Sequence, residues 1–144
     1  MTIIIDTNVI ISALISKGVV RELVVYNPGE FITPDWCFQE VLEHQSAWNR
    51  NGRGVKEVGS IIQDLKDHFI IPIPKTEYQK KMRTASSLID DPDDVPILAL
   101  ALSLDNAGIW TFDIKHFNTM RIAEKSRILT TDDVRRIIMN KRDL

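Results

Sequence analysis

The sequence has a single cysteine, Cys37, so no disulfide can form within the chain. Long apolar runs are missing too. The longest, residues 95–102, contains a proline and is far shorter than the roughly 20 residues that a membrane-spanning helix needs. No basic leader precedes the apolar residues at the N-terminus, which argues against a secretory signal peptide. These absences predict a cytoplasmic protein without a membrane anchor.

An excess of basic residues is also lacking. The chain has 18 Lys and Arg against 20 Asp and Glu, and its formal net charge is −2. Nucleic-acid-binding domains are usually basic, although a local basic strip can serve the same purpose. Glycine and proline number only six each, and 44% of the residues are apolar, which excludes a disordered chain. We expect one folded domain over residues 1–144.

Short apolar runs alternate with helical patterns along the chain. Expected strands cover residues 3–5, 31–33, 69–73, 109–112 and 128–130. Expected helices begin near residue 9 and continue with 19–26, 35–48, 55–68, 77–88, 94–104 and 132–139. This alternation predicts an α/β fold, a three-layer α/β/α sandwich around a mostly parallel sheet. Ligands of such folds bind at the carboxyl ends of the strands.

Carboxylates stand where the predicted strands end. Asp6 follows the first strand, Asp113 follows the strand at 109–112, and the acidic run 90–94 precedes an apolar helix. Any one of them could be a helix cap or a turn residue. Two carboxylates about 4 Å apart, however, repel by about 4 kcal/mol at an effective dielectric near 20. Protons or a bound cation would relieve that repulsion, and hard divalent cations such as Mg²⁺ or Mn²⁺ take oxygen ligands of this kind.

Two other acidic positions have simpler interpretations. Helical periodicity places Glu40 at the edge of an apolar face, which predicts a solvated boundary residue. Asp132 and Asp133 follow two threonines and open the last helix. Acids in the first turn of a helix are favoured by its dipole, so we interpret this pair as capping residues.

Four segments, taken together and in order, resemble a PIN domain. They are IIDTN at 4–8, Glu40 after the second strand, DPDDVPILALA at 91–101 and IWTFD at 109–113. The resemblance covers nearly the whole chain and implies a Rossmann-like sheet and a metal-dependent ribonuclease. Many prokaryotic members are VapC-type toxins held inactive by an antitoxin. The resemblance therefore implies an RNA substrate, a possible antitoxin partner and a homodimer.

The resemblance also implies roles for individual residues. Four acids would hold one or two Mg²⁺ or Mn²⁺ ions and act in catalysis: Asp6, Glu40, Asp94 and Asp113. Asn8 and Thr111 would orient these acids by hydrogen bonds. Within the acidic run Asp94 fits best, because the apolar stretch begins at the expected distance from it, while Asp91 and Asp93 could substitute for it or support the ligands. The implied reaction is hydrolysis of single-stranded RNA to a 5′-phosphate and a 3′-hydroxyl.

The sequence departs from the toxin-type pattern at one place. Many toxin-type members carry a further acid shortly after the last of the four, whereas Asp113 is followed here by Ile114, Lys115 and His116. That puts a fifth carboxylate, and the occupancy of a second metal position, in doubt. His116 has two interpretations: a surface histidine, or a group that contacts phosphate or helps a leaving group.

Two other functions compete with the nuclease. A PIN-like module could bind RNA or a protein without cutting, and the loss of one of the four acids would favour it, but none is lost. A metal-dependent phosphatase of the haloacid dehalogenase type uses two aspartates in a D-x-D pair at a strand end. Asn8 occupies the second of those positions here, which argues against the phosphatase.

Overall fold

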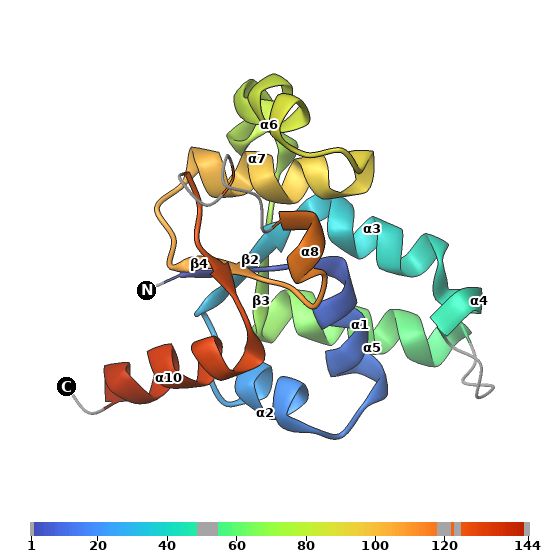
Figure 1. The fold of residues 1–144 in the computed structure, drawn as a ribbon. Helices are drawn as coiled ribbons and strands as arrows, with labels where there is room; N and C mark the ends of the chain where they lie inside the picture. The colour runs from blue at the N-terminus through green and yellow to red at the C-terminus, as the bar shows by residue number, and fades with distance from the viewer. Residues whose placement is uncertain (1, 49–54, 118–121, 123–124, 143–144) are drawn as a thin grey trace.

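The computed structural model describes residues 2–48, 55–117, 122 and 125–142. Its centre is a five-stranded sheet in the order β3-β2-β1-β4-β5, shown in Figure 1. The strands are β1 (Ile3–Ile5), β2 (Phe31–Pro34), β3 (Ile70–Ile73), β4 (Gly108–Trp110) and β5 (Ile128–Leu129). Every described pairing is parallel, which confirms the predicted class of sheet.

Helices cover both faces of this sheet. They are α1 (Thr7–Ile15), α2 (Val19–Val25), α3 (Asp35–Glu43), α4 (Gln45–Trp48), α5 (Val55–His68), α6 (Met82–Leu88), α7 (Val95–Ser103), α8 (Ile114–Phe117) and α10 (Thr131–Arg142). Single 3₁₀ turns form η1 (Lys75–Glu77), η2 (Gln79–Lys81) and η3 (Pro92–Asp94). In Figure 1, α7 lies on one face with α6 stacked over it, while α2, α5 and α10 lie on the other. The three-layer prediction is therefore confirmed.

The strand β1 and the helix α7 carry apolar residues on every side because other elements cover every side of them. Ile3, Ile4 and Ile5 of β1 are fully buried, since a central parallel strand has helices on both faces. Every residue from Val95 to Ala101 is buried as well, because α7 is sandwiched between the sheet and α6. None of the helices within the described residues has the length and apolar character needed to cross a bilayer.

The order of the strands reverses beside β1. The chain first builds outward through β2 and β3, then returns to place β4 on the other side of β1. Such a reversal opens a crevice at the carboxyl ends of the two strands, where ligands of open α/β sheets bind. Ile5 pairs with Trp110, and the backbone N–H of Asp6 donates to the carbonyl of Trp110 at 3.1 Å. The residues that follow β1 and β4 therefore start side by side.

Some element boundaries differ from the prediction. The helix expected over residues 35–48 is divided at His44 into α3 and α4. The helix expected from residue 77 begins only at Met82, because Tyr78 is buried and its hydroxyl donates to Asp35 at 2.8 Å. This long-range contact overrides the local helical pattern. The strand expected over 109–112 is β4, and α8 was not predicted.

The interpretation of Asp132 and Asp133 as capping residues is confirmed in part. The backbone N–H of Asp133 donates to the Thr130 hydroxyl at 3.1 Å, and the N–H of Thr130 donates to the Asp133 carboxylate at 2.9 Å. This reciprocal pair is a capping box at the start of α10. Asp132 instead forms an ion pair along the helix, with its Oδ1 3.9 Å from Nη1 of Arg135.

Candidate active site

A pocket of about 440 Å³ opens at the carboxyl edge of the sheet. It is lined by Asp6, Thr7, Asn8, Ile11, Glu40, His44, Asp91, Asp93, Asp94 and Asp113. Six of these residues are acidic, and no lysine or arginine is found among the described residues of the lining. The pocket thus contains all four acids that the resemblance selects. Such a concentration of like charge is unfavourable unless protons or cations neutralise it.

Asp6 is held at both carboxylate oxygens. It follows β1 and caps α1, where Oδ1 accepts from the backbone N–H of Thr7 at 2.7 Å. Oδ2 accepts from the Thr111 hydroxyl at 2.7 Å. Burial raises the pKa of Asp6, and these two hydrogen bonds act in the opposite direction. The charged form is therefore costly but fixed in orientation.

Glu40 reaches the pocket from α3. Its Oε2 accepts from the Thr7 hydroxyl at 3.0 Å, and the side chain is half-buried. Burial raises the pKa of Glu40, and the charges of Asp93 and Asp6 raise it further. Helical periodicity predicted a solvated residue because it describes one helix alone. The contact with Thr7 depends on how α3 packs against α1.

Asp94 has the most unusual environment of the four acids. It occupies the N-cap position of α7, yet its side chain makes no capping hydrogen bond. The residue is 7% exposed, and Oδ2 is buried without a hydrogen-bond partner among the described residues. Burial, followed by the charges of Asp6 and Asp91, raises the pKa of Asp94 to about 7. A buried acceptor without a donor is rare in proteins and marks a position that a proton, a water or an ion can satisfy.

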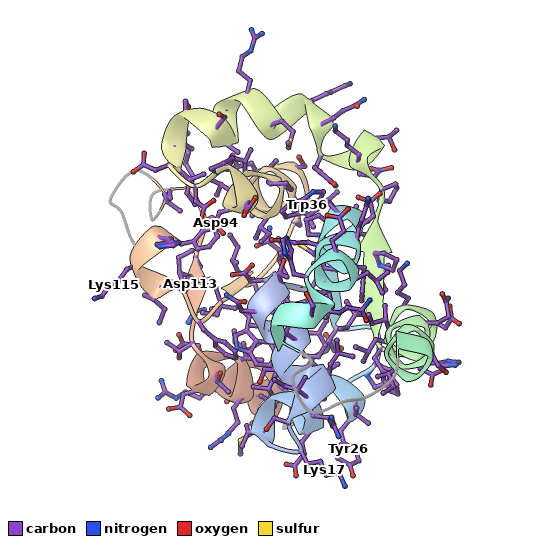
Figure 2. The ribbon with its side chains drawn as sticks, turned by 90° about the vertical axis from the view of Figure 1, so that its right-hand side faces the viewer. Lys17, Tyr26, Trp36, Asp94, Asp113 and Lys115 are labelled. Atoms are coloured by element: carbon purple, nitrogen blue, oxygen red, sulfur yellow. The ribbon has the colours of Figure 1, made fainter. Side chains whose placement is uncertain are left out.

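Asp113 follows β4 and lies in the same pocket. Its Oδ2 accepts from the side-chain amide of Asn8 at 3.1 Å. Its backbone N–H donates to the Thr111 hydroxyl at 3.0 Å, and that same hydroxyl donates to Asp6. Thr111, which is buried, therefore connects the two acids across the strand reversal. Asp94, at the start of α7, and Asp113, just before α8, line the same pocket and are labelled in Figure 2.

A family model described as a PIN domain matches residues 4–135. The chain belongs to the PIN domain family. PIN domains are generally metal-dependent nucleases that act on RNA and typically use Mg²⁺ or Mn²⁺. A comparison with curated proteins gives no match.

The pocket of this PIN domain fits a hard divalent cation. Carboxylate oxygens are the donors that Mg²⁺ and Mn²⁺ prefer. Oδ2 of Asp94, which accepts no hydrogen bond from the described residues, is available as a metal ligand. The raised pKa values of Asp6, Glu40 and Asp94 have burial as their largest cause, and neighbouring acids add to it. A bound cation would reverse both effects by favouring the charged forms.

The remaining acidic residues of the PIN domain pocket are Asp91, which caps η3, and Asp93 within η3. Asp91 is half-buried, and its Oδ1 accepts from the backbone N–H of Asp93 at 2.9 Å. Asp93 is exposed at the pocket wall. Of the three neighbouring acids that could have served as the fourth ligand, Asp94 is the buried one. The resemblance selected Asp94 because it stands immediately before the apolar helix.

The sequence alone did not place two histidines, His44 and His116, at the pocket. His44 lines the pocket at the break between α3 and α4, a break that the helical pattern did not predict. His116 lies on α8, and its Nδ1 is 3.4 Å from Oδ2 of Asp94. The turn after Asp113 brings it there, with the His116 backbone N–H donating to the Asp113 carbonyl at 3.1 Å.

Proposed function

We propose that this PIN domain is an endoribonuclease that hydrolyses single-stranded RNA with Mg²⁺ or Mn²⁺. The observation that carries the proposal is the buried Oδ2 of Asp94. Among the described residues it has no hydrogen-bond partner, and it lies in a pocket with five other acids and no described lysine or arginine. Asp6, Glu40, Asp94 and Asp113 would be the metal ligands and catalytic residues. When bound, the cation supplies charge neutralisation at the scissile phosphate and lowers the pKa of water beside it.

The chain's own residues prepare the pocket for that chemistry. Thr111 and the backbone of Thr7 fix the oxygens of Asp6, while the Thr7 hydroxyl positions Glu40. Asn8 holds one oxygen of Asp113. A carboxylate held in this way needs little reorganisation when a ligand arrives, which is the basis of electrostatic preorganisation. The expected products carry a 5′-phosphate and a 3′-hydroxyl.

The test is cleavage of a labelled pool of single-stranded RNA by the purified protein. Wild type is compared in Mg²⁺, in Mn²⁺ and in chelator, beside the variants Asp94→Asn and Asp113→Asn. Asp132→Asn is the matched control, because Asp132 is an exposed acid on α10 outside the pocket. We expect metal-dependent cleavage in wild type and Asp132→Asn and none in the other two variants.

Three outcomes would contradict the proposal. Cleavage that persists in chelator would exclude a metal-dependent reaction. Equal cleavage by wild type and both pocket variants would remove Asp94 and Asp113 from the catalytic set. RNA binding without cleavage in either metal would favour the alternative, a non-catalytic module that binds RNA.

We also propose, from the resemblance to VapC-type members alone, a cytoplasmic toxin that acts as a homodimer and is blocked by an antitoxin protein. A toxic ribonuclease should stop the growth of a bacterial host that expresses it, and Asp94→Asn should restore growth at the same protein level. Continued growth with folded, RNA-cleaving protein in the cells would rule out a toxin with targets in that host.

A further inference from the structure

We propose that Asp91, Asp94 and His116 form a cation position that prefers transition-metal ions such as Mn²⁺, Co²⁺ or Zn²⁺ over Mg²⁺. This position shares Asp94 with the pocket described above but adds a nitrogen ligand from α8. It goes beyond the proposed nuclease, because a metal could occupy it whether or not the protein cleaves RNA.

The backbone brings the two acids of this position together. Asp91 caps η3 and Asp94 is its last residue, so they are three residues apart along a 3₁₀ turn. A 3₁₀ helix has three residues per turn, which places side chains at this spacing directly above each other. One ligand atom from each of Asp91, Asp94 and His116 can be chosen so that all lie within 4.8 Å of one another. Small side-chain rotations would bring three such atoms onto one ion.

The second observation is the facing pair of Asp94 and His116. Oδ2 of Asp94 is buried, lacks a hydrogen-bond partner among the described residues, and lies 3.4 Å from Nδ1 of His116. The imidazole nitrogen is therefore within ion-pair distance of that oxygen, and pairing the two without a metal requires a proton on Nδ1. When the ring proton is on Nε2, Nδ1 carries a lone pair that faces the carboxylate oxygen. Two facing acceptors are held together favourably by a cation between them.

The position is open to solvent from the side of α8. A separate hollow of about 420 Å³ is lined by Ile89, Asp90, Asp91, Lys115 and His116, and Asp91 also lines the main pocket. Figure 2 shows the labelled Lys115 side chain extending outward, away from Asp94. Its ammonium group therefore does not occupy the space between Asp94 and His116, and a metal ion has a route in.

The nitrogen ligand determines the preference for transition metals. Mg²⁺ is bound almost only by oxygen and retains much of its water, whereas imidazole suits Zn²⁺, Cu²⁺ and Ni²⁺, and affinity for a mixed site rises along the divalent series. A pocket of carboxylates alone would show a smaller preference for Co²⁺ over Mg²⁺. The ratio of Co²⁺ to Mg²⁺ affinity is therefore the quantity that reports on His116.

The experiment measures Co²⁺ and Mg²⁺ affinities by calorimetry, without RNA, for wild type, His116→Asp and His44→Asp. Both substitutions put a carboxylate in place of an exposed histidine near the acidic pocket, so they change its charge in the same direction. Only the first removes the proposed nitrogen ligand. We expect the Co²⁺ to Mg²⁺ affinity ratio to fall about tenfold or more in His116→Asp and to stay unchanged in His44→Asp.

Pulsed electron paramagnetic resonance on the Mn²⁺-loaded protein identifies the ligand directly. We expect a nitrogen-14 coupling in wild type and in His44→Asp, and its loss in His116→Asp. Absence of that coupling in wild type, or an equal fall in the affinity ratio for both variants, would overturn the inference. Because neither readout needs RNA, a nitrogen-coupled site in a protein that does not cleave RNA would support this inference while contradicting the proposed nuclease.

Discussion

Asp94 is the acid whose charged form the fold disfavours most clearly. Burial and the charges of Asp6 and Asp91 raise its pKa from 3.8 to about 7. Between these two values the folded protein keeps a proton that the unfolded chain releases, so stability falls as the pH rises from about 4 to 7. Above the folded pKa the full penalty remains. The metal-free protein therefore carries a destabilising charge at neutral and alkaline pH.

Replacing Asp94 by asparagine removes that penalty. We expect Asp94→Asn to raise the free energy of unfolding at pH 8 by about 1–3 kcal/mol. This is less than the roughly 4 kcal/mol equivalent to the change in pKa, because the pocket is open to solvent. The gain should disappear below about pH 4. Urea denaturation in chelator at pH 4 and pH 8 measures it, and an equal gain at both pH values would contradict the electrostatic cause.

Thr111 is expected to matter through the acids that it positions. Its hydroxyl donates to Asp6 and accepts from the backbone of Asp113. We expect Thr111→Val to weaken Mn²⁺ binding about tenfold. Thr33→Val is the matched control, because the Thr33 hydroxyl is equally buried but donates to the Ile5 carbonyl. Calorimetric titration tests both, and equal losses in the two variants would show that Thr111 acts only on stability.

At the scale of elements, Gly108 allows the start of β4 to approach the backbone before β5 closely, and β4 leads to Asp113. Its φ is 142°, and a Cβ there would lie 2.6 Å from the Arg127 carbonyl oxygen. We expect Gly108→Ala to destabilise the protein by about 2–4 kcal/mol, because the added carbon meets backbone in a conformation that favours glycine. Gly29→Ala is the control, since Gly29 also has a positive φ but nothing lies within 4 Å of the added Cβ.

Thermal unfolding of both glycine variants checks this difference. If Gly29→Ala lowers stability by a similar amount, the positive φ alone explains the effect, and the close approach of β4 to the backbone before β5 does not. The pairing of these strands also holds Trp110 and Leu129 in register. Gly108→Ala should therefore reduce metal affinity as well, because Thr111 and Asp113 follow directly after Trp110.

The elements that sequence predicted well are those whose pattern is local. Apolar β1 and α7 were recognisable because burial on all sides leaves an uninterrupted apolar run. The segment before Met82 was not, because the contact between Tyr78 and Asp35 joins residues far apart in the chain. The site follows the same rule. Strand ends revealed Asp6 and Asp113, whereas the role expected of Glu40 came only from the family resemblance.

At the scale of the whole molecule, one end carries exposed apolar side chains. Val19 on α2, Tyr26 just after it and Met139 on α10 line one shallow hollow, and all three are exposed, Tyr26 at 71%. Figure 2 shows Tyr26 and Lys17 at the opposite end of the molecule from Asp94. An apolar patch of this kind is typical of an interaction surface, which is compatible with the proposed homodimer.

We expect the double variant Tyr26→Ser and Met139→Ser to convert the proposed dimer to a monomer without loss of fold. Ile71→Ser is the control, because Ile71 is an exposed apolar residue on the edge strand β3. Light scattering after size-exclusion chromatography gives the mass of each protein. A monomeric wild type would contradict the homodimer, and a double variant that stays dimeric would place the interface elsewhere.

Metal binding should couple the pocket to the stability of the whole chain. A cation that binds only the folded state stabilises it by an amount that grows with metal concentration relative to Kd. Because the cation must displace the proton from Asp94, whose pKa is about 7, its apparent affinity should rise with pH. For Mg²⁺ we expect about tenfold tighter binding at pH 8 than at pH 6, with release of protons on binding.

Thermal unfolding with and without Mg²⁺ measures this coupling. The increase in Tm on adding Mg²⁺ should be larger at pH 8 than at pH 6, although the metal-free protein is the less stable at pH 8. In Asp94→Asn the increase should be small at both pH values, because the titrating ligand is gone. An increase in wild type that is the same at both pH values would mean that the cation binds without Asp94, and Asp113 with Asp6 would then be the centre of the site.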